Sequence, residues 1–101
     1  MPTSDSAMTP QQRQLRDEWR MAIGKAIKGL RDQEGMTQQQ LADQSGIDRT
    51  TIVHLERGQR SILLDRLLPL LTALSTRPSD LIEMIDFDYD WEQRRRQSAA
   101  D

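Results

Sequence analysis

Apolar residues recur every three or four positions in five stretches of this chain, which is the spacing of amphipathic helices. The first stretch covers residues 11–34. It follows a capping box at residues 9–12 and ends before Gly35, a residue suited to a left-handed helix stop. One long helix or two abutting helices are therefore predicted here. Gly24 and Gly29 inside the stretch indicate either a close helix contact or a break.

Two short helices joined by a tight turn are predicted next. A second capping box at residues 37–40 opens a helix that Gly46 ends. A third helix, over residues 48–57, begins with an aspartate, which is a good N-cap. Its spacing directs Ile52 and Leu55 inward, so the opposite face of this helix is expected to project outward.

Leucines at helical spacing predict a fourth helix from Leu64 to Leu74. Pro69 lies inside it, and an interior proline costs on the order of 3 kcal/mol because one backbone hydrogen bond is lost. We therefore expect a kink or a later helix start. Pro78 opens a fifth short helix that runs to about Met84.

The segment 85–91 departs from helical spacing, because apolar and acidic residues alternate strictly. This pattern is typical of a strand, and a lone strand would need its copy in a second subunit as partner. The alternatives are a disordered acidic tail or a helical extension that stacks Ile85 on Tyr89 and Phe87 on Trp91. These four residues are the candidate dimer contacts, and an exposed part of the leucine-rich fourth helix is the other candidate.

The length of 101 residues allows one compact domain with short tails. We divide it into a flexible tail (1–9), a domain (10–85) and an acidic-aromatic arm and tail (86–101). Cysteine is absent, so apolar packing, helped by self-association, must stabilise the fold. No apolar run approaches the roughly 18 residues of a membrane span and no secretory signal is found, which predicts a cytoplasmic protein without a membrane partner.

The net charge of −2 argues at first against a nucleic-acid partner. The charge is, however, unevenly placed: residues 11–66 carry ten basic against eight acidic side chains, and the acidity gathers over residues 80–92. The middle of the chain is therefore basic enough to permit DNA binding.

Residues 36–58 combine a short helix, a glycine turn and a second short helix, which describes a helix-turn-helix. Ala42 is small where the second helix must cross, and Gly46 permits the sharp reversal. A helix about 10–12 Å across fits a major groove about 12 Å wide. The second helix of this motif is therefore a candidate DNA-reading element.

With these features, residues 20–85 closely resemble the Cro and phage-repressor type of helix-turn-helix family, also called the XRE family. The matching positions are 23–24, 30–31, 37–38, 41–42, 45–47, 52, 56–58, 67, 73–74 and 79–82. The resemblance implies an all-α, five-helix, lambda-repressor-like domain, here with an N-terminal helical extension, that binds double-stranded operator DNA as a homodimer. The departures are Pro69 and the apolar pair at residues 62–63, where the family has Pro or Ser.

The resemblance also implies roles for individual side chains. Arg49 would pair with guanine and Thr50 would contact a thymine methyl or a phosphate. Glu56 would form a structural pair with Arg31. The base contacts implied are Arg49, Thr50, Val53 and His54. The phosphate contacts implied are Gln38, Arg57, Arg60 and Lys28, with Lys25 as a weaker candidate.

Enzymatic chemistry has little support in the sequence. His54 is the one histidine, so neither a metal site nor a cofactor is expected. Aspartates 86, 88 and 90 alternate as at the start of a calcium loop, but a following glycine and a distal glutamate are lacking.

The leading hypothesis is a sequence-specific transcription regulator, a repressor that binds a palindromic operator as a homodimer. Three alternatives remain open. They are an antitoxin whose C-terminal arm binds a toxin, a restriction-modification controller, and a protein-interaction adaptor that does not bind DNA.

Overall fold

The computed structural model describes residues 7–88 and 95–96. Five helices form within residues 7–88, and no strand occurs among the described residues. No helix in this part of the chain is both long enough and apolar enough to cross a bilayer. The all-α, five-helix prediction is confirmed. The helices are α1 (Pro10–Gln33), α2 (Gln38–Ser45), α3 (Arg49–Glu56), α4 (Leu64–Ala73) and α5 (Pro78–Asp88).

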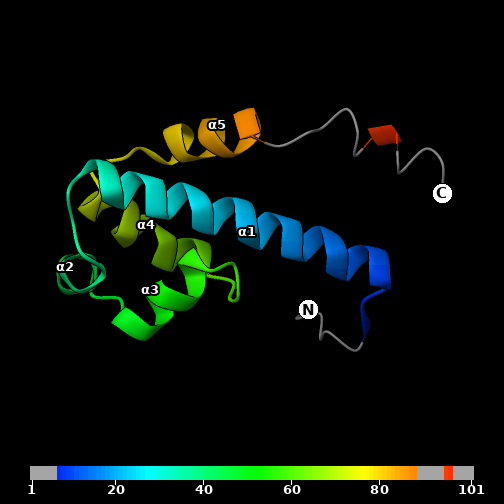
Figure 1. Cartoon of the computed structure of the whole chain (residues 1–101), viewed down its shortest axis with the longest axis horizontal. Coiled ribbons are helices and arrows are strands. Elements are labelled where there is room, and N and C mark those ends of the chain that lie inside the picture. Colours follow the sequence, from blue (N-terminus) through cyan, green and yellow to red (C-terminus); the bar gives the residue numbers. More distant parts are fainter. Residues whose placement is uncertain (1–6, 89–94, 97–101) are drawn as a thin grey trace.

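Helix α1 is one continuous helix rather than two abutting ones. Its start has the predicted capping box: the Gln12 amide N–H donates to Thr9 Oγ1 (3.1 Å), and the Thr9 N–H donates to Gln12 Oε1 (2.8 Å). Proline at the first helical position needs no hydrogen-bond acceptor there. The N-terminal half of α1 projects past the other four helices (Figure 1).

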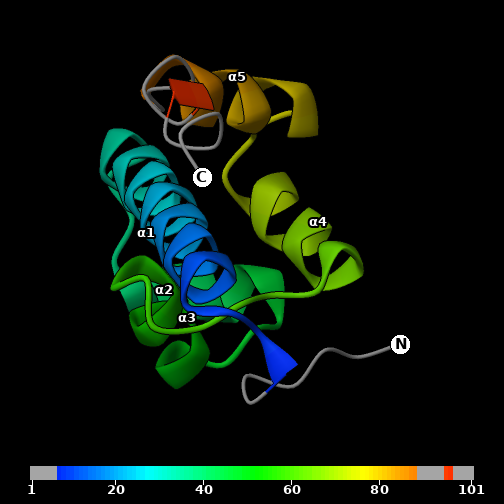
Figure 2. The same ribbon diagram turned by 90° about the vertical axis from the view of Figure 1, so that its right-hand side faces the viewer.

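The helices are arranged around α1, with α5 on one side of it and the pair α2–α3 on the other (Figures 1 and 2). Helix α1 packs against α3 and α5, while α2 packs against α3 and α4. The apolar stripes of all five helices meet in one core. Its side chains are Ala26, Ile27, Leu30, Leu41, Ala42, Ile47, Ile52, Leu55, Leu70, Leu71, Leu74, Leu81 and Ile85.

Gly24 marks a close helix contact, one of the two explanations that the sequence allowed. A Cβ atom there would collide with the carbonyl oxygen of Leu55, at the end of α3. At Gly29 a Cβ atom would meet no other group within 4 Å. Gly24 therefore lets the backbones of α1 and α3 approach, which fixes the position of α3 on the molecule.

Helix α4 begins at Leu64 as predicted, with Pro69 inside it, so the alternative of a later start is wrong. Its N-cap is Leu63, which has no side-chain oxygen to accept a hydrogen bond from the first turn. This uncapped start lies at the pair of residues where the sequence departs from the family pattern.

Helix α5 runs to Asp88, beyond the predicted end at Met84. A strand is therefore wrong for residues 85–88. Ile85 is only 5% exposed and belongs to the core of its own chain, so its assignment to a dimer contact is corrected. The side chain of Phe87, and Tyr89 and Trp91 as a whole, lie outside the described residues.

Candidate nucleic-acid interface

The turn between α2 and α3 is built from its local sequence. Thr37 and Gln40 form the predicted capping box at the start of α2. Gly46 ends α2 in the left-handed region (φ +74°), a conformation that side chains disfavour. Ile47 then enters the core at 4% exposure. The reversal is thus fixed by a glycine and by an apolar anchor directly after it.

Helix α3 has one buried face and one outward face. Thr51, Ile52 and Leu55 are at most 5% exposed. Arg49 and Thr50, at the start of the helix, are exposed. The other two predicted base-reading residues, Val53 and His54, are only half-buried. The outward face therefore offers one cation and one hydroxyl, with an apolar and an imidazole side chain further along.

Asp48 caps α3 and is itself held by Thr51. The Thr51 N–H donates to Asp48 Oδ2 (2.9 Å), and Thr51 Oγ1 donates to Asp48 Oδ1 (2.7 Å). These bonds, the side-chain one first, hold the pKa of Asp48 below its usual value. Thr51 is therefore held against the cap of α3, and its side chain is buried rather than turned to the outward face.

Arg60 reaches back from the α3–α4 loop to the start of α3. Its Nη1 donates to Thr51 Oγ1 at 3.3 Å. The sequence predicted Arg60 as a phosphate contact but gave no sign of this link, because the link depends on the path of residues 57–60. A second link that the sequence missed holds the same loop: Arg20 Nε on α1 donates to Ser61 Oγ at 2.8 Å.

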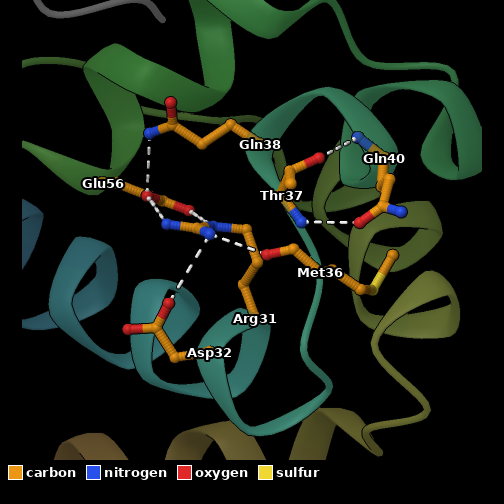
Figure 3. Close-up of polar contacts among 7 residues, drawn as sticks. All are labelled: Arg31, Asp32, Met36, Thr37, Gln38, Gln40 and Glu56. Carbon is orange, nitrogen blue, oxygen red and sulfur yellow. Dashed lines mark hydrogen bonds and ion pairs between the residues drawn. The ribbon is translucent and has the colours of Figure 1, made fainter.

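The carboxylate of Glu56 is the centre of a polar cluster beneath α2 and α3 (Figure 3). Arg31 Nε donates to Glu56 Oε2 (2.6 Å) and Arg31 Nη2 donates to Glu56 Oε1 (2.9 Å). The two side chains are 11% and 3% exposed, so this is a buried, bidentate ion pair. Hydrogen bonding to Glu56 raises the pKa of Arg31.

Gln38 and Met36 join the same cluster from the start of α2. Gln38 Nε2 donates to Glu56 Oε1 (3.1 Å), and Arg31 Nη1 donates to the backbone oxygen of Met36 (2.8 Å). Figure 3 shows the Glu56 carboxylate between Gln38 and Arg31. The cluster therefore ties α1, the start of α2 and the end of α3 together.

An open hollow of about 490 Å³ separates the start of α2 from the start of α3. The exposed Arg49 lines it on the α3 side. The other lining residues are Arg31, Gly35, Met36, Thr37, Gln38 and Gln39. Two predicted contact residues, Arg49 and Gln38, thus share one concave surface, beside the unpaired N–H groups of the first turn of α2.

The remaining predicted phosphate residues are less closely connected. Arg57 is exposed and forms the C-cap of α3. Lys28 and Lys25 are exposed on α1 and form no hydrogen bond or ion pair with α2 or α3 among the described residues. The structure thus gathers Gln38, Arg49, Thr50 and Arg60 around the two short helices and leaves the lysines apart.

Comparison with known sequences matches the part of the chain that contains α2 and α3. The profile of the helix-turn-helix family matches residues 27–81, more than half of the chain. The chain is 32% identical over 65 residues to the control protein C.BamHI of Bacillus amyloliquefaciens, which covers 63% of this chain and 80% of that protein.

Solved structures of similar proteins have the same fold. The restriction-modification controller protein C.AhdI from Aeromonas hydrophila is 39% identical, with a TM-score of 0.60 over 61% of this chain and 94% of that one. The controller protein C.Esp1396I, solved as a tetramer in complex with its natural 35 base-pair operator, is 32% identical, with a TM-score of 0.62 over 65% of this chain and 87% of that one. With this fold, and with a family match over most of its helices, the chain belongs to the Cro/C1-type helix-turn-helix family.

Proposed function

We propose that this chain is a sequence-specific DNA-binding transcription regulator that represses from a palindromic operator as a homodimer. The observation that carries this proposal is the division of α3 into a core face and an outward face that begins with Arg49 and Thr50. A helix anchored in this way can enter the major groove without rearrangement of the domain.

Arg49 is the main proposed base contact. It is exposed at the start of α3, where a recognition helix reaches base edges, and a guanidinium pairs bidentately with guanine. Thr50 is the second proposed base contact, and the half-buried Val53 and His54 have supporting roles.

Gln38, Arg57, Arg60 and Lys28 are the proposed phosphate contacts, which position the domain without reading sequence. Gln38 has two amide hydrogens, and one of them is donated to Glu56. The second is available for a phosphate oxygen. Glu56 therefore holds the amide of Gln38 in one orientation, with Nε2 directed to the carboxylate, at the edge of the hollow that Arg49 shares.

The biological setting that we propose is control of a restriction-modification system. It rests on the names of the relatives, since C.BamHI is a control protein and C.AhdI and C.Esp1396I are restriction-modification controller proteins. Because the proposed target is genomic DNA, the proposed site of action is the cytoplasm. The described residues hold no feature that favours the antitoxin or the adaptor alternative over this one.

The test is DNA binding by Arg49→Ala, measured as fluorescence anisotropy on a selected site and on random duplex. Loss of a bidentate base contact is expected to cost about 1–3 kcal/mol on the selected site and little on random DNA. Arg77→Ala is the matched control, because Arg77 is an exposed arginine outside α2 and α3. It is expected to bind both duplexes like the wild type.

Unchanged affinity of Arg49→Ala for its selected site would overturn the role of Arg49 in base reading. Equal affinity of the wild type for selected and random DNA would overturn the proposed sequence specificity.

A further inference from the structure

The loop between α3 and α4, residues 57–63, passes beside α1 on its way to α4 (Figures 1 and 2). It carries two of the proposed phosphate contacts, Arg57 and Arg60, and both are exposed. A loop is ordinarily more mobile than the helices that it connects, and an arginine on a mobile loop must be ordered when it binds DNA. The contacts that hold this loop therefore bear on how well the protein binds.

Arg20 of α1 holds the loop beside Arg60. Its Nε donates to the hydroxyl oxygen of Ser61 at 2.8 Å, and Ser61 directly follows Arg60 in the chain. From the other side, Arg60 Nη1 donates to Thr51 Oγ1 at 3.3 Å, at the start of α3. Thr51 is the one hydrogen-bond partner of the Arg60 side chain among the described residues, so the remaining guanidinium N–H groups stay available. Arg60 is thus fixed near the start of the recognition helix with donors to spare.

Met21, the next residue of α1, holds the loop beside Arg57. A Cβ atom at Gly58 would collide with the thioether and the Cα atom of Met21, and Gly58 directly follows Arg57 in the chain. Gly58 also lies in the left-handed region (φ +70°), which side chains disfavour. Each of the two loop arginines is therefore followed at once by a residue that α1 contacts.

We propose that Arg20 is a positioning residue for DNA binding, which through Ser61 holds Arg60 where its guanidinium meets a phosphate of the DNA backbone. This inference rests on the proposed function and adds to it a residue that does not itself touch DNA. A loop that is ordered in advance avoids the loss of entropy that an unheld loop undergoes on binding. Arg20 and Met21 lie before residue 27, where the family match begins, so this support comes from the extended part of α1.

The hydrogen bond between Arg20 and Ser61 contributes little to the fold itself. Ser61 is exposed and Arg20 is partly exposed, and a hydrogen bond at the surface largely replaces one to water. Loss of this bond should thus leave the free energy of unfolding nearly unchanged. A loss of DNA affinity without a loss of stability therefore separates positioning of the loop from support of the fold.

The experiment measures the DNA affinity of the full chain by fluorescence anisotropy, on the selected and the random duplex, over a range of salt concentrations. Ser61→Ala and Arg20→Met are each expected to weaken binding about three- to tenfold on both duplexes, because a phosphate contact does not read sequence. Ser61→Thr keeps the hydroxyl and is expected to bind like the wild type. Arg16→Met is the matched control for the lost charge, since Arg16 lies one turn earlier on α1 and pairs with Asp17 of the same helix; it is also expected to bind like the wild type. Urea denaturation of each variant checks that the fold is retained.

A double-mutant cycle shows whether the effect of Ser61 passes through Arg60. Arg60→Ala is expected to reduce the slope of log affinity against log salt concentration by about one for each bound copy. Ser61→Ala added to Arg60→Ala is expected to weaken binding no further. An equal loss with and without Arg60 would overturn the inference, since Ser61 or Arg20 would then contact DNA directly.

Two further outcomes separate this inference from the proposed function. If the wild type binds DNA and Ser61→Ala binds it equally well, the positioning role is overturned and the proposed function stands. If the wild type shows no salt-dependent DNA binding, both are overturned.

Discussion

At the scale of single residues, Glu56 links α3 to both α1 and α2. Its two carboxylate oxygens accept three side-chain hydrogen bonds, two from Arg31 and one from Gln38. A buried carboxylate is unfavourable unless a cation pairs with it and its oxygens are hydrogen-bonded, and here both conditions are met. The pair thus stabilises the folded arrangement in which α3 and Gln38 lie beside each other.

Removal of the cation should reveal how much the pair contributes. Arg31→Met leaves the Glu56 carboxylate, 3% exposed, without its partner, and is expected to lower the free energy of unfolding by about 3 kcal/mol. Urea denaturation measures this loss. The control is Asp32→Asn, because Asp32 lies 3.5 Å from Arg31 but is 61% exposed; the expected change is below about 1 kcal/mol. Equal losses in the two variants would contradict the special role of Glu56.

Asp48 should make the stability of the protein depend on acid. Its pKa in the folded state lies below the usual 3.8, because Thr51 donates two hydrogen bonds to the charged form. The resulting stability is complete above pH 3.8 and is lost as the pH falls from there through the lower folded pKa.

The check is to compare thermal midpoints of the wild type and Asp48→Asn at pH 7 and pH 3. Asparagine keeps a capping oxygen without the titrating charge. The wild type is expected to lose more stability between the two pH values than the variant. A variant that loses as much as the wild type would show that Asp48 is not responsible.

Some residue-level features followed from the sequence and others could not. The Arg31–Glu56 pair was implied by the family resemblance and is present. The bond from Arg60 to Thr51 depends on how residues 57–60 turn back over α3, which no local pattern encodes. The exposure of Arg49 and Thr50 was predictable, because helical spacing alone directs Ile52 and Leu55 inward.

At the scale of helices, the contact between α1 and α3 determines where the recognition helix sits. The two backbones approach each other at Gly24, and a Cβ atom at this position would collide with the Leu55 carbonyl oxygen. Gly29 lies on the same helix without such a neighbour. Substitution of glycine by alanine can therefore be compared at a crowded and at an open position of α1.

Gly24→Ala and Gly29→Ala should have opposite effects on stability. The first forces α1 and α3 apart, for an expected loss of about 1–3 kcal/mol. The second adds a good helix former in open space, for an expected gain of up to about 1 kcal/mol. Urea denaturation of both variants checks the prediction. If Gly24→Ala is tolerated as well as Gly29→Ala, the close approach does not hold α3 in place.

The helices were largely predictable, because each of the first three has a capping residue where its apolar pattern begins. The failure came at residues 85–88, where strict alternation of apolar and acidic residues suggested the beginning of a strand. In a helix Ile85 lies one turn after Leu81, and both side chains are buried in the core. Tertiary burial therefore decided the conformation of residues 85–88, and the alternating pattern did not.

At the scale of the whole molecule, a net charge of −2 is compatible with a DNA interface because the charges are unevenly placed. Arg49, Arg57 and Arg60 are exposed on or just after α3, while the acidic residues gather from Asp80 onward. The sequence indicated this separation. It offered two candidate surfaces for joining two copies, the segment 85–91 and an exposed part of the fourth helix, and the burial of Ile85 in its own core removes one residue of the first.

The central claim is that two α3 helices, one from each copy of the chain, read DNA. Selection of bound duplexes from a random pool with the full chain tests this claim most directly. The account predicts enrichment of a two-fold symmetric site whose half-sites lie about one helical turn apart, with a guanine within reach of Arg49. A bound pool without sequence enrichment, or one enriched in a single unrepeated half-site, would contradict it.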